Sequence, residues 1–297
     1  MDTPAEQHLL TFIESYIAAL AAHDPSRLPL ASGARYTENT NEIAFGQGLW
    51  GTFSGLGDYD IRVADPARNA VCLLASITEH EAPAIFALRL RIEADRIVEA
   101  EALVARGRAG AETMGVADPV FTTEVPPEQR TPQADMIALV DRYFDGVEQS
   151  DAFDLRFHPD CVRRENGSQS TSIPDRTEDF VAGRFHGYAL DIRAQFATRM
   201  WSFIERVSPR RYVIANERTG VVVGFFGFQH PGAITHFIAP TGDRVPMPPY
   251  ALAPSTFEIA EIFKFEAGAF RRIEAIGVIL PFGQHPGWPA PQHGRTT

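Results

Sequence analysis

Two short motifs carry a carboxylate that could move a proton. Residues 36–39 (Tyr-Thr-Glu-Asn) and 163–166 (Arg-Arg-Glu-Asn) share a Glu-Asn pair within expected strands. Successive strand residues face opposite sides of a sheet, so only one member of each pair can face a pocket. An inward glutamate would be a natural general base, because apolar walls raise its pKa. An inward asparagine could bind a substrate oxygen but could not take a proton. Alternatively, both glutamates are solvated and both asparagines close turns.

Further polar candidates lie in the second half of the chain. Histidine is the side chain best suited to proton transfer near neutral pH. We expect Arg164 or His158 to hold a substrate oxygen, and Tyr188 and His230 to contact the substrate. A lone histidine can equally be a surface or packing residue. His230 and His236 do not have a recognised zinc-binding spacing, so no metal site is expected.

Residues 46–51 (Gly-Gln-Gly-Leu-Trp-Gly) match a dinucleotide-binding fingerprint by letters alone. That fingerprint works only between a strand and a helix whose N-terminus binds the pyrophosphate. Residues 52–57 contain too much glycine for such a helix. We therefore expect a glycine-rich turn that presents Trp50 to a pocket.

Composition disfavours several functional classes. The 297 residues include 27 basic and 38 acidic side chains, and the net charge of −11 would repel nucleic acid. Lys264 is the single lysine and lies in a strand-like stretch, which disfavours Schiff-base enzymes and phosphate-loop nucleotidases. The sequence lacks a nucleophile elbow and a Cys-His signature, which disfavours covalent hydrolysis. We expect no cofactor.

The sequence also allows an expectation of the cellular compartment. No apolar run is long enough to span a bilayer, and the first residues do not resemble a signal peptide. Cys72 and Cys161 are the only cysteines, and without a secretion signal they are expected to be reduced. We therefore expect a cytoplasmic protein that binds no membrane.

An internal repeat positions these residues. Residues 8–39 and 135–166 align without a gap, and their apolar side chains recur at the three- and four-residue spacings of a helix. Each copy is expected to open with a helix and continue into a strand. The helices are expected at Glu6–Ala22 and Pro132–Glu148, and the strands at Ala34–Thr40 and Cys161–Gly167.

Later blocks repeat as well, with hairpin turns expected at Ala94-Asp95 and Ala267-Gly268. The second copy is longer by an expected helical stretch at 177–207 and by a proline- and glycine-rich loop at 229–256, which we interpret as a lid. The domains are expected at 1–110 and 132–297, joined by a linker at 111–131.

The order of elements predicts an α+β fold of two tandem cone-shaped domains. In each, a curved antiparallel sheet wraps on N-terminal helices and leaves a pocket at its open end. Residues 14–24 contain a tyrosine, an Ala-Ala-Leu run and a terminal aspartate, and the 36–39 motif is followed by Gly46, Gly48 and Trp50. These features resemble the nuclear transport factor two-like superfamily, which includes SnoaL-like cyclases and ketosteroid isomerases.

The resemblance implies roles for individual residues. It places the catalytic aspartate of the isomerases at Asn39 and Asn166, or at the neighbouring glutamates if the register slips by one. It places Tyr16 and Tyr143 at the oxyanion-hole tyrosine, where a buried phenol could donate to a developing enolate. A tyrosine on an amphipathic helix could equally pack its ring and expose its hydroxyl.

We therefore expect a cofactor-free lyase or isomerase acting on a small, hydrophobic, oxygenated substrate, aromatic ones included. It would be a dehydratase, a double-bond isomerase, a cyclase or an aldehyde-releasing lyase. Glu165 would be the general base and Tyr143 the donor to developing negative charge. The expected substrate-binding residues are Asn166, Tyr188, His230, Tyr16, Glu38 and Trp50.

The longer second copy is expected to be the more active one, because its insertions could close over the cone. The two copies are expected to form a pseudo-dimer within one chain, which is compatible with a homo-oligomer of whole chains. The alternative from another class is a non-catalytic module that binds a small ligand or another protein.

Overall fold

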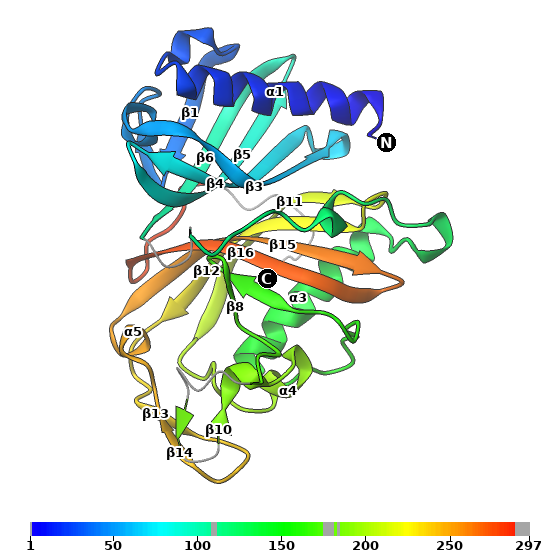
Figure 1. The fold of residues 1–297 in the computed structure, drawn as a ribbon, viewed down its shortest axis with the longest axis vertical. Helices are drawn as coiled ribbons and strands as arrows, with labels where there is room; N and C mark the ends of the chain where they lie inside the picture. The colour runs from blue at the N-terminus through cyan, green and yellow to red at the C-terminus, as the bar shows by residue number, and fades with distance from the viewer. Residues whose placement is uncertain (1, 108–111, 175–180, 183–184, 289–297) are drawn as a thin grey trace.

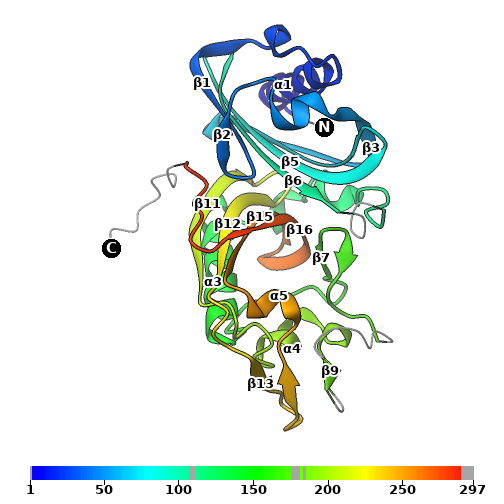
Figure 2. The ribbon, with the colours of Figure 1, turned by 90° about the vertical axis from the view of Figure 1, so that its left-hand side faces the viewer.

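The structure is a computed structural model that describes residues 2–107, 112–174, 181–182 and 185–288. It contains two six-stranded sheets, one from each half of the chain, stacked face to face (Figure 1). A long helix covers the outer face of each sheet, so the layers run helix, sheet, sheet, helix (Figures 1 and 2). The expected α+β fold class is therefore confirmed.

The first half opens with α1 (Pro4–Ala21), close to the expected helix. Thr3 and Glu6 form a capping box that satisfies two backbone N–H groups at the helix start. A buried stripe that includes Ile13 and Leu20 packs on the sheet. The short 3-10 turns are η1 (Pro25–Arg27), η2 (Gly48–Gly51) and η3 (Pro66–Arg68). The strands are β1 (Leu30–Glu38), β2 (Asn41–Ile43), β3 (Phe53–Asp65), β4 (Ala70–Glu79), β5 (Ala82–Glu93) and β6 (Arg96–Arg106).

The second half repeats this order with additional elements. Its long helix is α3 (Gln133–Gln149), and α4 (Ile192–Phe196) and α5 (Pro249–Leu252) are short. The 3-10 turns are η4 (Pro119–Phe121), η5 (Pro127–Gln129) and η6 (Gly187–Ala189). The sheet contains β7 (Arg163–Glu165), β8 (Ser168–Gln169), β11 (Arg206–Asn216), β12 (Val221–His230), β15 (Ser255–Glu266) and β16 (Ala269–Pro281). Two small hairpins are built from β9 (Val181–Ala182) with β10 (Phe185–His186), and β13 (His236–Ile238) with β14 (Arg244–Pro246).

The two sheets have equivalent topology. Their orders are β3-β4-β5-β6-β1-β2 and β11-β12-β15-β16-β7-β8. In each sheet the strand after the long helix pairs in parallel with the last strand, β1 with β6 and β7 with β16, and the other pairs are antiparallel. The sequence repeat therefore corresponds to a repeat of structure.

The facing surfaces of the two sheets form one of three apolar cores. Tyr59 donates a 2.6 Å hydrogen bond from the first sheet to Glu274 of the second. Arg211 of the second sheet donates to Glu101 of the first at 2.5 and 2.9 Å, and Arg89 donates to the same carboxylate at 2.9 Å. These buried bonds fix the relative position of the halves.

Two expectations for the insertions need correction. Among its described residues, the helical stretch expected at 177–207 contains only the three-residue 3-10 turn η6 and the five-residue helix α4 as helical elements, and residues 177–180 and 183–184 lie outside the described part. The loop expected at 229–256 begins inside β12 and contains the β13–β14 hairpin and α5. Its prolines end strands and begin a helical turn, so its composition did not require an irregular loop.

Candidate functional site

A cavity of about 850 Å³ lies in the second half, on the face of the sheet that α3 covers. Residues of α3, β7, β8, β12, β15 and β16 line it, together with η6 and the segment that follows α4. The first half contributes to the rim through Asn39, Ile85 and residues 104–107. The walls are mainly aromatic and aliphatic, and a small number of polar side chains converge in them, as is usual for small-molecule sites. Among these polar side chains are Arg163, Tyr143, Glu165, Glu261 and His230.

Strand alternation decides which side chains of β7 enter the cavity. Arg163 and Glu165 line it, with Nε of Arg163 3.6 Å from Oε1 of Glu165. Arg164, between them, faces the other way and donates to the backbone oxygens of Thr113 and Gly167. The expectation that Arg164 holds a substrate oxygen is therefore wrong, because its neighbours in the strand occupy the cavity face.

Arg163 is a buried cation held mainly by neutral acceptors. Its guanidinium donates to Ser170 Oγ at 3.0 Å, to Tyr143 Oη at 3.1 Å and to Gln195 Oε1 at 2.8 Å. The ring of Trp201 lies 4.8 Å from the guanidinium carbon. Arginine stays protonated in proteins, so this network maintains a positive charge beside the cavity.

Tyr143 lies on the buried face of α3, where the helical spacing of the apolar residues brings it to the sheet. Phe196, Phe263 and Phe270 surround its ring with centroid distances of 5.3–5.7 Å. Burial raises the pKa of the phenol, and Arg163 opposes that rise. Because its oxygen accepts from Arg163, the hydroxyl proton is available for another acceptor.

Glu261 is the functional candidate that sequence reasoning missed. It is 2% exposed in the middle of β15 and lines the cavity. Its Oε2 has no hydrogen-bond partner among the described residues. Burial raises the pKa of this carboxyl well above its usual value, and the charge of Glu165 adds to the rise. A usable signal was present, because Glu261 is the one acid in an otherwise apolar alternate row, Phe257-Ile259-Glu261-Phe263-Phe265.

Glu165 is the more hydrated of the two cavity carboxyl groups. Its side chain is 41% exposed, whereas Glu261 is enclosed. The expected base therefore does line the cavity, in a different environment from its partner. Such a pair, one carboxyl enclosed and the other hydrated, can divide acid and base roles.

The two repeated asparagines have a structural role. Asn166 exchanges two hydrogen bonds with the backbone of Gly277, at 2.8 and 3.0 Å, and Asn39 does the same with Val104 at 2.8 and 3.1 Å. Both adopt left-handed backbone conformations, with φ of 46° and 48°. Asn166 lines the cavity, but its side-chain oxygen and nitrogen both pair with the backbone. The asparagines therefore close turns, as in the alternative reading of the motifs, whereas Glu38 is buried and not solvated as that alternative also expected.

Tyr188 and His230 line the same cavity, as expected of substrate-binding residues. His230 is 5% exposed and packs edge-on against Phe203 at a centroid distance of 4.9 Å. Burial lowers its pKa to about 4, which keeps the imidazole neutral at physiological pH.

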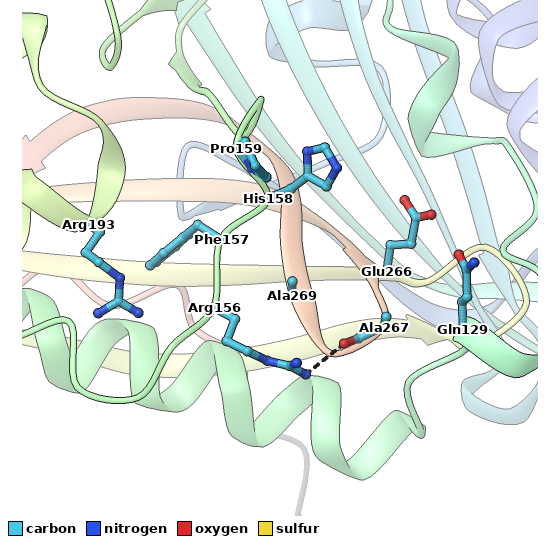
Figure 3. A pocket seen from close by; sticks show the side chains of 9 residues that line it. All are labelled: Gln129, Arg156, Phe157, His158, Pro159, Arg193, Glu266, Ala267 and Ala269. Atoms are coloured by element: carbon cyan, nitrogen blue, oxygen red, sulfur yellow. Dashed lines mark hydrogen bonds between the residues drawn. The ribbon is translucent and has the colours of Figure 1, made fainter.

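His158 does not reach this cavity. It lines a separate surface hollow of about 630 Å³ with Arg156, Arg193 and Glu266 (Figure 3). Its backbone nitrogen donates to Phe270 beside the turn between β15 and β16. The expectation that His158 holds a substrate oxygen beside Glu165 is therefore wrong for this cavity, because the loop before β7 places the two side chains in different depressions.

The first half encloses its equivalent side chains in a core. Tyr16 and Trp50 are each 1% exposed and pack at a ring distance of 5.2 Å. Glu38 accepts hydrogen bonds from Tyr36, the backbone of Leu49 and Arg106 at 2.7–3.0 Å. None of these three expected substrate-binding residues, Tyr16, Glu38 and Trp50, lines the cavity described above. The turn at 46–51 therefore buries its tryptophan, contrary to the expectation.

Sequence differences between the copies explain this contrast. Tyr36 pairs with Ala100 as Arg163 pairs with Ile273, and Leu88 pairs with Ala102 as Glu261 pairs with Ala275. The first copy thus has tyrosine and leucine where the second has its buried arginine and glutamate. The charged centre belongs to the second copy.

Among the described residues, no group of three or more His, Cys, Asp and Glu could hold a metal ion. In the same part of the chain, no helix is long and apolar enough to cross a membrane.

Comparison with known proteins identifies a family. The model of the family described as "Domain of unknown function (DUF8021)" matches residues 129–277, half of the chain. The chain belongs to the DUF8021 family. The matched region contains Tyr143, Arg163, Glu165 and Glu261. No curated protein matches the chain.

Solved structures are similar to parts of this DUF8021 protein. An NTF-2 like protein of unknown function from Burkholderia xenovorans is 12% identical, covers 34% of this chain and 85% of its own, and has a TM-score of 0.29. A steroid delta-isomerase from Pseudomonas aeruginosa is 21% identical, with 37% and 88% covered and a TM-score of 0.29. An LEH-like epoxide hydrolase from M. tuberculosis is 16% identical, with 34% and 85% covered and a TM-score of 0.26.

Proposed function

We propose that this protein is an enzyme that transfers protons on a small, hydrophobic, oxygenated substrate bound in the second-half cavity. The observation that carries the proposal is Glu261, a fully enclosed carboxyl with an unpartnered oxygen in a ligand-sized cavity. Burying such a group is unfavourable for folding, so its presence favours a functional role.

The two cavity carboxyl groups support a division of roles. Glu165, beside the Arg163 cation and partly hydrated, is the proposed base. Glu261, whose pKa is raised by burial, is the proposed protonated acid. A neutral carboxylic acid in an apolar site can donate a hydrogen bond to an oxyanion.

The proposed step begins at a carbon next to a substrate carbonyl. Glu165 takes the proton, and the C–H bonding electrons move onto the carbonyl oxygen as an enolate. Tyr143 and protonated Glu261 donate hydrogen bonds to that oxygen, and Arg163 positions the tyrosine. Returning the proton to a different carbon gives an isomerase. Expelling hydroxide from the adjacent carbon, which leaves as water once protonated, gives a dehydrating lyase. In an aldehyde-releasing lyase Glu165 would instead take the proton of a hydroxyl on the adjacent carbon, the carbon–carbon bond would break to release the aldehyde, and its electrons would form the same enolate.

The cavity walls support a substrate with apolar surface. Aromatic side chains from several elements line it, and Tyr188, Trp201 and Phe228 are among them. Such walls favour flat or cyclic carbon skeletons and exclude water from the reacting atoms.

Proton exchange tests the proposal without knowledge of the natural substrate. The probe is 2-tetralone in D₂O, with deuterium incorporation at the α-carbon followed by NMR. We expect exchange above the buffer rate in the wild type and a loss of about 100- to 10,000-fold in Glu165→Gln. Glu205→Gln is the matched control, because Glu205 is exposed. Binding of tetralone without enhanced exchange would instead favour a non-catalytic ligand-binding protein.

A further inference from the structure

Two enclosed polar groups lie at one end of the cavity, away from Glu261. His230 ends β12 and Ser255 begins β15, and the two residues are paired across the strands. Directly paired residues of antiparallel strands point to the same side of a sheet, with Cβ atoms about 5 Å apart. Both therefore share the cavity side with Phe228 and Phe257, which line the cavity.

Neither group is satisfied within the described part of the chain. His230 and Ser255 are each 5% exposed, and His230 Nε2 and Ser255 Oγ have no hydrogen-bond partner there. An unpaired polar atom in an apolar site costs about 1–3 kcal/mol. Two such atoms side by side, one of them on a cavity-lining residue, indicate that a ligand group completes their hydrogen bonds.

The surroundings define the chemistry of that group. Burial lowers the pKa of His230, and among the described residues no charged neighbour contributes to that shift. Phe203 and Phe257 add aromatic walls, and Tyr250 of α5 lines the same end, where α5 lies beside the sheet (Figure 2). A neutral imidazole and a hydroxyl in this setting suit a neutral hydroxyl or carbonyl, because an ion would be poorly solvated.

The distance from His230 and Ser255 to Glu261 limits the length of the ligand. Ser255 and Glu261 lie on the same strand, and six residues of β-strand span at most about 20 Å. Phe257 and Ile259 lie between them on the cavity side. The cavity is thus polar at both ends and apolar in the middle.

We propose that His230 and Ser255 form a second polar subsite, and that the ligand is an elongated, mainly apolar molecule with a neutral oxygen group at each end. One group binds near Tyr143 and Glu261, and the other binds His230 and Ser255. This inference deepens the proposed function by using the same cavity. It concerns binding, so it can be tested whether or not the protein turns over a substrate.

The test compares ligands that differ only in their second hydroxyl. The probes are 4-phenylphenol against 4,4′-dihydroxybiphenyl, and the corresponding mono- and dihydroxy p-terphenyls, titrated by calorimetry against the full chain. One neutral hydrogen bond adds about 0.5–1.5 kcal/mol. We therefore expect the dihydroxy member of at least one pair to bind about 3- to 10-fold more tightly.

Variants of His230 and Ser255 show whether these residues cause the tighter binding of the dihydroxy probes. His230→Leu should abolish the preference for the second hydroxyl and retain binding of the monohydroxy probe, which also reports that the cavity is intact. His230→Gln keeps a donor and an acceptor and should retain part of the preference, and Ser255→Ala should reduce it. Equal binding of both members of both pairs to the wild type overturns the proposal, as does a preference that persists in His230→Leu. Neither result depends on the exchange assay, so the failure of one proposal is distinguishable from the failure of the other.

Discussion

Nη1 of Arg163 donates a hydrogen bond to the hydroxyl oxygen of Tyr143 at 3.1 Å inside the second-half cavity. The arginine thereby fixes the phenol from one side and leaves its proton free to point at a ligand. It also places a permanent positive charge behind the oxygen, which strengthens the hydroxyl as a donor. This relationship links the buried cation to the proposed stabilisation of an enolate.

Removal of the Tyr143 hydroxyl should slow proton exchange and leave binding of the probe nearly unchanged. We expect Tyr143→Phe to lower the exchange rate of 2-tetralone by about 100- to 1,000-fold, as for the loss of one oxyanion donor, with little change in its Kd. The matched control is Tyr16→Phe, the repeat-equivalent change in the first half, which should leave exchange unchanged. Equal losses in both variants would contradict a site confined to the second copy.

Replacing Glu261 by leucine should increase the stability of the protein and abolish its activity. Leucine occupies the equivalent position in the first copy as Leu88, which is fully buried. Replacing an unpartnered carboxyl by an apolar side chain of similar size should raise the free energy of unfolding by about 1–3 kcal/mol. Chemical denaturation of Glu261→Leu measures this gain, and the exchange assay should show lost activity. A destabilised Glu261→Leu would mean that the carboxyl has an undetected structural partner.

Glu258 should give the stability a distinct pH dependence. It lies between the two sheets beside Arg211, and burial raises its pKa from 4.5 to about 7. The folded state then holds a proton that the unfolded state has released between these values, so stability falls as pH rises through that window and levels off above it. The shift corresponds to about 3 kcal/mol. Urea titrations from pH 4 to 8 should show this slope in the wild type and in the exposed-site control Glu128→Gln. A slope that remains unchanged in Glu258→Gln would contradict the assignment.

The segment after β16 should stabilise the first half from outside. Trp288 is 6% exposed, donates to Thr37 Oγ1 at 2.9 Å, and lies 4.4 and 5.0 Å from the guanidinium carbons of Arg35 and Arg89. We expect Trp288→Ala to lower the free energy of unfolding by about 3 kcal/mol, within the range for large aromatic truncations. Calorimetry should show the loss. A wild-type Tm would indicate that the tryptophan does not hold this position in solution.

The repeat and the local elements could be predicted because their signals are local. Helical spacing gave both long helices within two residues at each end. The turns at Ala94-Asp95 and Ala267-Gly268 were also expected, and all four residues have positive φ. The division into domains at 1–110 and 132–297 stays a prediction.

The site was harder to predict because it depends on which face of a strand each side chain occupies and on contacts between residues that are far apart in the sequence. β7 is three residues long, too short for the hydrophobic pattern to show whether Arg163 or Arg164 faces inward. Glu261 lies on a long strand that is buried on both sides and has a second buried acid, Glu258, on the opposite face, so its place as the one acid of an apolar row is a weak signal. His158 is close to Glu165 in sequence, but the intervening loop places it in a different hollow.

A crystal structure with 2-naphthol tests the central claim most directly, because its oxygen is attached to an sp² carbon with the geometry of an enolate. We expect the naphthol ring between the aromatic walls of the second-half cavity. Its oxygen should lie about 2.5–3.0 Å from both Tyr143 Oη and a carboxyl oxygen of Glu261. Naphthol bound in the first half, in the hollow beside His158, or in the cavity with its oxygen turned away from both groups would contradict the assignment of this cavity as the active site.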